Sequence, residues 1–407
     1  MGSIQTELSL LQKAPLFPPD PIFGLTKQYL ADGSPNKILL GGGTYRDEKG
    51  QPWVLPSVGL AEEAVRGSGH EHLPIAGLQS FRDRAAELIL HGTQALKGGR
   101  IASCQSLSGT GALFLAGAAL REIDPSPRDL LLTSPTWANH KRIFESLGFV
   151  VKDLPYYKNQ RFDLDSYLGA LDSSRPGSIV ILHACAHNPT GCDPTREQWK
   201  RIAAVVEAKS LFPIFDSAYL GFKSGDVDAD SWAIRYFVED LGLEAGICVS
   251  FSKNMGLYGE RIGLVAFVTR DSSLTQNVVT VLERVQRATV STPPLYGAKL
   301  VSTILGTSEI KSQWEKDIIT MSSRILAVRQ KLHQRLLELQ TPGDWSHIIA
   351  QEGMFSYLGL SPTQVAHIRD EYHIYMLGSS RIALTGLNDG NLEYVAQCVD
   401  KAVRQIE

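Results

Sequence analysis

Polar side chains with complementary chemistry follow three short apolar runs of this 407-residue chain, and they are Asn188, Asp216 with Tyr219, and Lys253. A lysine amine forms an imine with an aldehyde. A carboxylate can keep the nitrogen of a pyridine ring protonated, which makes the ring a better electron sink. Asn188 and Tyr219 can hydrogen-bond a phenolate oxygen on such a ring. The set therefore suits a pyridine-aldehyde cofactor, although each residue alone is more typical of a turn or of solvated surface.

A phosphate on such a cofactor needs an anion site, and two segments offer one. Ser108-Gly109-Thr110-Gly111 precedes an alanine-rich helical run. Backbone N–H groups at a helix start point at an anion, and hydroxyls add donors. Ser250, Ser252 and Arg261 lie close to Lys253 in the sequence, and a guanidinium can form a bidentate pair with a phosphate. Alone, each segment indicates no more than a turn or a surface salt bridge, but their joint order indicates one site.

The apolar runs before these residues must position them. The runs are 178–183, 211–215 and 246–251, and each is short, rich in β-branched or aromatic residues and followed by a polar turn. Between the first two runs, Thr195 and Gln198 form a capping box, and apolar residues then recur at helical spacing. This alternation predicts an α/β fold with a largely parallel sheet. Ligands of such sheets bind beyond the carboxyl ends of the strands.

The length of the chain predicts two domains, because 407 residues exceed what one hydrophobic core usually supports. The first forty residues contain scattered prolines and predict an extended arm that enters a strand at 37–40. A long helix is predicted at 309–339 as a bridge between domains, and a last helix near 391–403. We therefore predict a large domain at 48–310 and a small domain built from 1–47 and 311–407.

Composition argues against several classes of partner. The formal net charge of -3 indicates neither a nucleic-acid nor an anionic-membrane partner. Five cysteines without a C-x-x-C pair favour a reducing compartment. The N-terminus does not resemble a signal peptide or a mitochondrial presequence, so a cytoplasmic protein is expected. No metal site is predicted, since His70 and His72 are close in sequence but have no further ligands at suitable spacing.

Several motifs resemble the signatures of the aspartate aminotransferase family, and they are Gln51–Pro56, Ser134–His140, His183–Gly191, Phe215–Phe222, Ser250–Tyr258, Gly353–Tyr357 and Arg381–Leu387. The likeness runs from about Pro18 to the C-terminus. It implies a fold type I pyridoxal-phosphate (PLP) enzyme, with a mostly parallel central sheet flanked by helices and a small α/β domain. It also implies a homodimer with active sites at the subunit interface.

The resemblance also implies residue roles. Lys253 would form the Schiff base with pyridoxal 5'-phosphate and move the substrate α-proton, and Asp216 would pair with the pyridinium. The predicted cofactor site comprises these two residues together with Ser108, Gly109, Thr110, Trp137, Asn188, Tyr219, Ser250, Ser252, Arg261 and His72. The predicted substrate site comprises Gly43, Trp137, Asn188, Arg381 and, from the other subunit, Arg287. His140 and His187 would support these groups from behind. Without the motifs, Arg287 and Arg381 would read as ordinary salt-bridged arginines.

The sequence departs from the family pattern at positions around the substrate and the phosphate. His72 stands where a tyrosine normally reaches the partner's phosphate, and an imidazole is shorter than a phenol. The other departures are Gly42, Thr44, Phe114, Gly259, Val290 and Thr292. They leave two hypotheses open, which are ordinary activity despite sequence drift and a specialised enzyme with a changed substrate or reaction.

Three functions therefore compete. The leading one is transamination between a dicarboxylic L-amino acid, such as aspartate or glutamate, and a 2-oxo acid by a ping-pong mechanism. The second keeps the fold and cofactor but catalyses β-decarboxylation, β-elimination or replacement, or racemisation. The third is a non-catalytic binding protein, against which the complete set of Lys253, Asp216 and Arg261 argues.

Overall fold

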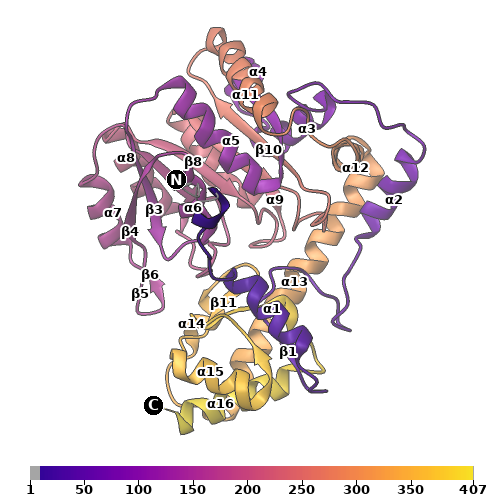
Figure 1. The fold of residues 1–407 in the computed structure, drawn as a ribbon, viewed down its shortest axis with the longest axis vertical. Coiled ribbons are helices and arrows are strands. Elements are labelled where there is room, and N and C mark those ends of the chain that lie inside the picture. Colours follow the sequence, from indigo (N-terminus) through magenta and orange to yellow (C-terminus); the bar gives the residue numbers. More distant parts are fainter. Residues whose placement is uncertain (1–9, 407) are drawn as a thin grey trace, which may run out of the picture.

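A seven-stranded sheet forms the centre of the larger body in the computed structural model, which describes residues 10–406 (Figure 1). In spatial order the strands are β2 (Ile101–Leu107), β10 (Ile262–Val268), β9 (Ala245–Ser250), β8 (Phe212–Ser217), β7 (Ile179–His183), β3 (Asp129–Ser134) and β4 (Val150–Pro155). Strand β10 is antiparallel to both of its neighbours, and the other pairs are parallel. The predicted α/β fold with a mostly parallel sheet is confirmed.

The three predicted apolar runs form the central strands β7, β8 and β9, which start or end within two residues of the predicted limits. Every residue of β7 and β9 is buried. A strand buried on both faces reads as a continuous apolar run rather than as an alternating one, and this is why these strands were visible in the sequence.

Helices cover both faces of this sheet (Figure 1). The helices of the larger body are α2 (Pro56–Val65), α3 (Gln79–Leu90), α4 (Gln94–Lys97), α5 (Ser108–Ile123), α6 (Asn139–Ser146), α7 (Leu164–Asp172), α8 (Arg196–Ala208), α9 (Val227–Asp230), α10 (Trp232–Arg235), α11 (Thr275–Thr289) and α12 (Tyr296–Gly306). Short turns of helix lie at Tyr236–Asp240 and Ser272–Leu274, and a small hairpin joins β5 (Tyr157–Lys158) to β6 (Arg161–Phe162). Helix α8 begins with the predicted capping box, in which Thr195 and Gln198 bond each other's backbone.

The long helix α13 (Ser308–Glu338) connects the two bodies, as Figure 1 shows. It packs on α2 and α12 near its start and on α14 (Ser346–Ala350) and α16 (Leu392–Gln405) towards its end. The predicted helix 309–339 is therefore present, shifted by one residue. The boundaries 48–310 and 311–407 stay a prediction, and residue 310 lies in the first turn of α13.

The smaller body combines both ends of the chain. Strand β1 (Ile38–Leu39) pairs in parallel with β12 (Ile374–Tyr375), and β11 (Phe355–Tyr357) pairs with β13 (Arg381–Ala383). Helix α15 (Pro362–Tyr372) packs on α16, and a short 3-10 turn covers Leu384–Gly386.

The prediction of an extended arm over the first forty residues is wrong for its second half. Residues Pro21–Ala31 form helix α1, and Leu10–Lys13 form a 3-10 turn. The side chain of Asp20 caps α1 by accepting the N–H groups of Ile22 and Phe23, and Pro21 occupies the first helical position. A proline there needs no N–H and has the right backbone angle, so it favours a helix start rather than extended chain.

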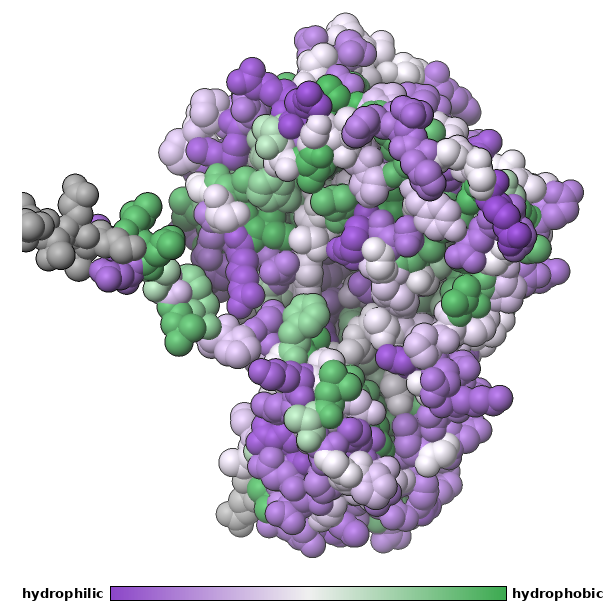
Figure 2. All heavy atoms as spheres, turned by 45° about the vertical axis from the view of Figure 1, so that its right-hand side comes forward, coloured by the Kyte–Doolittle hydropathy of each residue, from purple (hydrophilic) through white to green (hydrophobic). Residues whose placement is uncertain are grey.

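Large apolar side chains are exposed along residues 10–17, which project from the body at the left of Figure 2. They are Leu10, Leu11, Leu16 and Phe17, and each is at least 77% exposed. Further exposed apolar side chains are Val54, Leu60 on α2 and Tyr296 on α12. Within residues 10–406, no helix has the length and apolar character that a membrane span requires.

Candidate active site

The carboxyl ends of β7, β8 and β9 bring the predicted chemical groups together. Asn188 lies in the turn after β7, Asp216 is the last residue but one of β8, and Lys253 follows β9 by three residues. These strands are adjacent and parallel, so the segments after them emerge at one edge. A cavity at this edge is lined by Ser108, Gly109, Thr110, Leu113, Trp137, Asn188, Asp216, Ala218, Tyr219, Ser250, Lys253 and Arg261.

Asp216 ends a directional chain of hydrogen bonds. The N–H of Asn188 donates to Nδ1 of His183, so Nε2 of His183 carries a proton and donates to Oγ1 of Thr136. The Thr136 hydroxyl then donates to Nδ1 of His140, whose Nε2–H donates to Oδ2 of Asp216 at 2.9 Å. Burial lowers the pKa of His183 to about 3, which keeps this ring neutral. The chain fixes the tautomers of both histidines.

The second oxygen of Asp216, Oδ1, is buried and has no hydrogen-bond partner among the described residues. Burial alone would raise the pKa of Asp216, but the hydrogen bond from His140 and the nearby Lys253 ammonium outweigh it, and the pKa is lowered. A buried, charged acceptor without a partner is costly. Because Asp216 lines the cavity, Oδ1 suits a ligand that donates a proton there, such as a protonated ring nitrogen.

Lys253 presents its amine to the same cavity, and its Nζ makes no hydrogen bond or ion pair with any residue in the described part of the chain. Nζ lies 5.7 Å from the centre of the Tyr219 ring. Burial lowers the pKa of Lys253 to about 8, and the positive charges of Arg261 and Arg381 add to this effect, against the opposing charge of Asp216. The amine is thus available both as a nucleophile and as a base near neutral pH.

This lowered pKa predicts how the reactivity of Lys253 depends on pH in the cofactor-free protein. The neutral amine is the reactive form, so acetylation of Lys253 by acetic anhydride should speed up about tenfold per pH unit below pH 8 and level off above it. A lysine with the ordinary value of 10.5 would continue to gain reactivity up to about pH 10. Peptide mass spectrometry across pH 6–10 measures this, with N-acetyl-lysine amide as the reference. A rise that continues past pH 9 would contradict the lowered pKa.

The opposite end of the cavity suits an anion. Helix α5 begins at Ser108, and its N-cap residue, Leu107, makes no side-chain capping hydrogen bond. The hydroxyl of Ser108 lies 2.8 Å from those of both Ser250 and Ser252, and Arg261 donates to Ser252 at 3.5 Å. An uncapped helix start beside clustered hydroxyls and a guanidinium is a favourable phosphate site. The sequence placed Ser108–Gly111 before the helix, whereas the structure makes these residues its first turn, which aims their N–H groups at the cavity.

Arg381 lies at the other side of Asn188, where β13 meets the large body. Its guanidinium donates to the side-chain oxygen of Asn188 at 3.3 Å and to the carbonyl of Gly41 at 2.8 Å, and it lies 4.3 Å from the centre of the Phe355 ring. Its Nε is buried and has no partner among the described residues. Gly43 faces the same ring, since a Cβ there would lie 3.3 Å from Phe355. A buried guanidinium with a free donor suits a carboxylate.

The remaining predicted residues lie at the cavity, in the turn that carries Asn188, or outside the cavity. Trp137 packs edge-on against His140, and the Asn188 amide donates to the Tyr219 hydroxyl at 3.1 Å. His187 supports the turn rather than Asp216, because it bonds Thr133 and Thr190. His72 and Arg287 are exposed and do not line this cavity. Among the described residues, the Arg287 guanidinium hydrogen-bonds only the hydroxyl of Ser291, at 2.5 Å.

The sequence reasoning missed Leu113 and Ala218, which line the cavity, and Phe355, which packs on Arg381. Helical spacing could have found Leu113, because it follows Thr110 by three residues on α5. Ala218 lies inside a motif that was already recognised. Phe355 also lies inside a recognised motif, Gly353–Tyr357, but its contact with Arg381 arises only when β11 pairs with β13.

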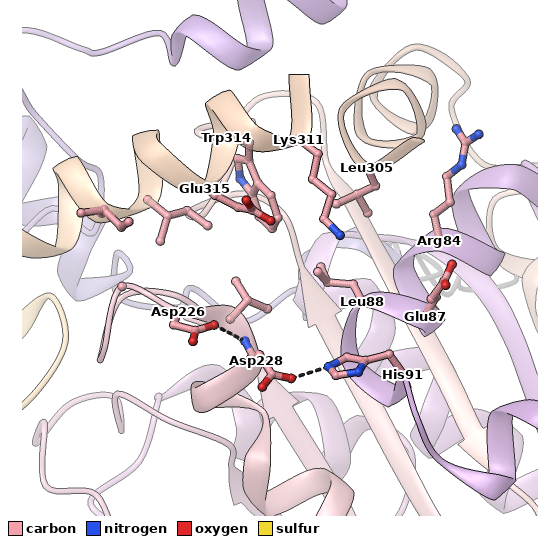
Figure 3. A pocket seen from close by; sticks show the side chains of 14 residues that line it. Arg84, Glu87, Leu88, His91, Asp226, Asp228, Leu305, Lys311, Trp314 and Glu315 are labelled. Carbon is pink, nitrogen blue, oxygen red and sulfur yellow. Dashed lines mark hydrogen bonds and ion pairs between the residues drawn. The ribbon is translucent and has the colours of Figure 1, made fainter. Parts of the chain in front are cut away.

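A separate cavity of about 600 Å³ lies between α3, the segment 225–228 and the first half of α13 (Figure 3). Figure 3 shows Lys311 and Glu315 reaching from α13 towards α3. The indole Nε1 of Trp314, on its wall, donates to the carbonyl of Asn254 at 2.8 Å. None of the predicted site residues lines this cavity. It is therefore distinct from the site that holds Lys253.

Comparison with known proteins agrees with this geometry. The family model of class I and II aminotransferases matches residues 35–399. The cytoplasmic aspartate aminotransferase of Schizosaccharomyces pombe is 44% identical over 395 residues, covering 95% of this chain and 96% of the relative. The chain belongs to the aspartate aminotransferase family.

Solved structures support the same placement of this aminotransferase. Aspartate aminotransferase from the cytoplasm of Saccharomyces cerevisiae matches with a TM-score of 0.95 and 42% identity, covering 98% of this chain and 99% of that one. An aromatic-amino-acid aminotransferase from Burkholderia pseudomallei, covalently bound to pyridoxal phosphate, matches with a TM-score of 0.94 and 37% identity over 97% and 100%. The predicted fold type I and the predicted transaminase class are confirmed, and the family implies pyridoxal phosphate as the cofactor.

Proposed function

We propose that this protein is a PLP-dependent transaminase that moves the amino group between a dicarboxylic L-amino acid of the aspartate or glutamate type and a 2-oxo acid. The observation that carries the proposal is the pairing, in one cavity, of an unpartnered lysine amine with an unpartnered buried carboxylate oxygen. The names of the curated relatives, which are cytoplasmic aspartate aminotransferases, support the substrate class.

The residues present fit pyridoxal phosphate. The uncapped start of α5, the clustered hydroxyls of Ser108, Ser250 and Ser252, and Arg261 would hold its phosphate. Asp216 would hold a proton on its ring nitrogen through Oδ1, and Asn188 with Tyr219 would contact its phenolate oxygen. When bound, the cofactor supplies an electron-withdrawing ring that stabilises negative charge at the substrate α-carbon.

Different residues of the chain would bind the substrate, move its proton and shield the ring. Arg381 and Asn188 would bind the α-carboxylate and so orient the substrate. Lys253, as a neutral amine, would take the substrate α-proton and deliver it to the aldehyde carbon of the cofactor. His140 keeps Asp216 oriented and charged through its hydrogen bond, so that the ring proton stays in place. Trp137 would cover the ring and exclude water from it.

Recognition of the second carboxylate is assigned to Arg287 from a second copy of the chain. Arg287 is exposed, lies outside the cavity of its own chain and makes no ion pair with the described residues, so its charge is available to a partner. The exposed Leu10, Leu11, Leu16 and Phe17 support a homodimer, because apolar side chains gathered on a projecting segment mark an interaction site. His72, also exposed, would reach the partner's phosphate. We infer a cytoplasmic location from the same relatives.

Arg287→Ala should selectively weaken the recognition of dicarboxylic substrates. Loss of one charge-assisted pair is expected to lower kcat/KM for aspartate by about 50-fold, with little change for alanine or phenylalanine. The matched control is Arg284→Ala on the same helix, which removes an exposed arginine paired with Glu122. Steady-state kinetics with each donor measures the effect. Equal losses for all donors would count against the assigned role, and so would a loss in the control.

The reaction itself is tested with purified, PLP-loaded protein supplied with aspartate and 2-oxoglutarate. Mass spectrometry should find oxaloacetate and glutamate. Formation of alanine and carbon dioxide instead would favour β-decarboxylation on the same fold. A protein that binds PLP but yields neither set of products would overturn the proposed substrate class.

A further inference from the structure

A lysine outside the cavity connects the two bodies of the molecule. Lys223 lies in the turn after β8, where its backbone N–H donates to the buried carboxylate of Asp230 at 3.2 Å. Its ammonium extends to Glu352, in the smaller body, at 2.6 Å and to Asp193, in the larger body, at 3.5 Å. The Asp193 side chain is only 3% exposed, and Lys223 is its only ion-pair partner among residues 10–406.

Each of the two carboxylates is anchored to a segment that leads to the active site. Asp193 accepts the N–H groups of Ala186 and His187 at 2.6 and 2.8 Å, and so holds the turn that carries Asn188. Glu352 donates its backbone N–H to the carbonyl of Gly191, on the same turn, at 2.7 Å. The ammonium therefore joins the Asn188 turn to the segment that precedes β11.

These two segments approach each other too closely for side chains at the crossing points. A Cβ on Gly191 would lie 2.8 Å from the carbonyl oxygen of Glu352, and a Cβ on Gly353 would lie 2.4 Å from the Cβ of Ala186. Both glycines also have positive φ angles, of 66° and 75°, which favour glycine. Such contact transmits any displacement of one segment directly to the other.

The smaller-body segment that contains Glu352 continues within a few residues to Phe355, whose ring contacts Arg381. Buried Arg329 on α13 holds this segment by donating to the carbonyls of Gly353 and Phe355, each at 2.8 Å. The Phe355 ring lies under the Arg381 guanidinium, and β11 pairs with β13, which begins at Arg381. The two ends of the Lys223 bridge thus lead to Asn188 and Arg381, the two residues assigned to the substrate α-carboxylate.

We propose that Lys223 is a positioning residue for transamination, which fixes Asn188 and Arg381 relative to each other by bridging Asp193 and Glu352. The inference rests on the proposed function, and it adds a specific electrostatic tie between the two bodies that sets how well the substrate carboxylate is bound. Lys223 does not line the cavity, and neither do its ion-pair partners Asp193 and Glu352.

Charge makes the bridge distinguishable from simple packing. Without Lys223, Asp193 and Glu352 would face each other with no counter-ion, and the segments would be pushed apart. The pKa of Glu352 is already raised by burial and by the charge of Asp193, against the opposing effect of Lys223. Removing the Glu352 charge should therefore partly repair the loss of Lys223, an outcome that a purely structural role does not predict.

The test compares Lys223→Met, Glu352→Gln, the double variant Lys223→Met/Glu352→Gln and Lys223→Arg in the PLP-loaded enzyme. Lys223→Met should raise KM for both aspartate and 2-oxoglutarate about tenfold, with kcat changed less than about threefold. The reason is that the bridge acts on substrate binding rather than on proton transfer by Lys253. The double variant should bind both substrates better than Lys223→Met does, and Lys223→Arg should keep most of the wild-type affinity for them. Lys331→Met is the control, because it removes a lysine that forms an equally short but exposed ion pair with Asp389.

Hydrogen exchange provides a readout that does not depend on activity. In Lys223→Met, and not in Lys331→Met, the amides of 186–193 and 351–357 should exchange faster together. The inference is overturned if the wild type is active and Lys223→Met leaves KM unchanged. It is also overturned if the double variant has a higher KM than both single variants. If the wild type lacks transaminase activity, the proposed function fails instead, and unchanged exchange in both segments would then overturn the bridge itself.

Discussion

Lys253→Ala should lower kcat for aspartate and 2-oxoglutarate by about 10⁴-fold, the largest effect expected of any single substitution. Lys253 is the only described group lining the cavity that combines an unpartnered amine with a pKa near 8, so no neighbour can take over proton transfer at the α-carbon. Single-turnover absorbance of the PLP-loaded protein mixed with aspartate measures this loss directly.

Two controls define what that result means. Lys253→Ala should still bind PLP, because the phosphate end of the cavity and Asp216 are untouched, and equilibrium dialysis can verify this. Lys97→Ala, at the end of α4 and away from the cavity, should leave kcat unchanged. Turnover of Lys253→Ala within tenfold of the wild type would remove the central assignment of the proposed function.

Arg381→Ala should lower kcat/KM by about 10³-fold for every amino acid donor, because truncating a buried, hydrogen-bonded charge leaves its partners unsatisfied. All donors share the α-carboxylate, so the loss should not depend on the side chain, in contrast to Arg287→Ala. Steady-state kinetics with aspartate, alanine and phenylalanine separates the two arginines.

Arg381→Lys tests whether charge or geometry matters. A lysine retains the positive charge but cannot make a bidentate pair or stack flat on Phe355, so it should recover only part of the loss. Full recovery would show that the carboxylate is held by charge alone. A loss restricted to dicarboxylic donors would transfer the distal-carboxylate role from Arg287 to Arg381.

The cofactor half of the site was largely predictable from sequence because its groups lie next to buried strands. A strand buried on both faces is a short apolar run, and the residue after it is placed at the sheet edge by the fold class alone. Asn188, Asp216 and Lys253 follow such runs, and the structure places all three on one cavity. The helix start at Ser108 was misplaced by a few residues, since positions within a first turn and just before it share the same composition.

The other half depends on contacts between distant segments, which local patterns do not encode. Phe355 reaches Arg381 only through the pairing of two three-residue strands. Lys223 and Glu352 lie far apart in the sequence, and neither belongs to an amphipathic or catalytic pattern. Arg287 and His72 are exposed and do not line the cavity of their own chain, so the sequence of one chain gives no neighbouring residue that would test their roles.

The pairing of β1 with β12 has a consequence for biosynthesis. A nascent chain that has reached the end of α13 contains all seven strands of the central sheet together with Lys253, Asp216 and the start of α5, but not β12, β13 or Arg381. Domains fold as units during translation, N-terminal parts first. The groups assigned to the cofactor are therefore synthesised before those assigned to the substrate, and β1 has no strand partner until β12 is made, more than three hundred residues later.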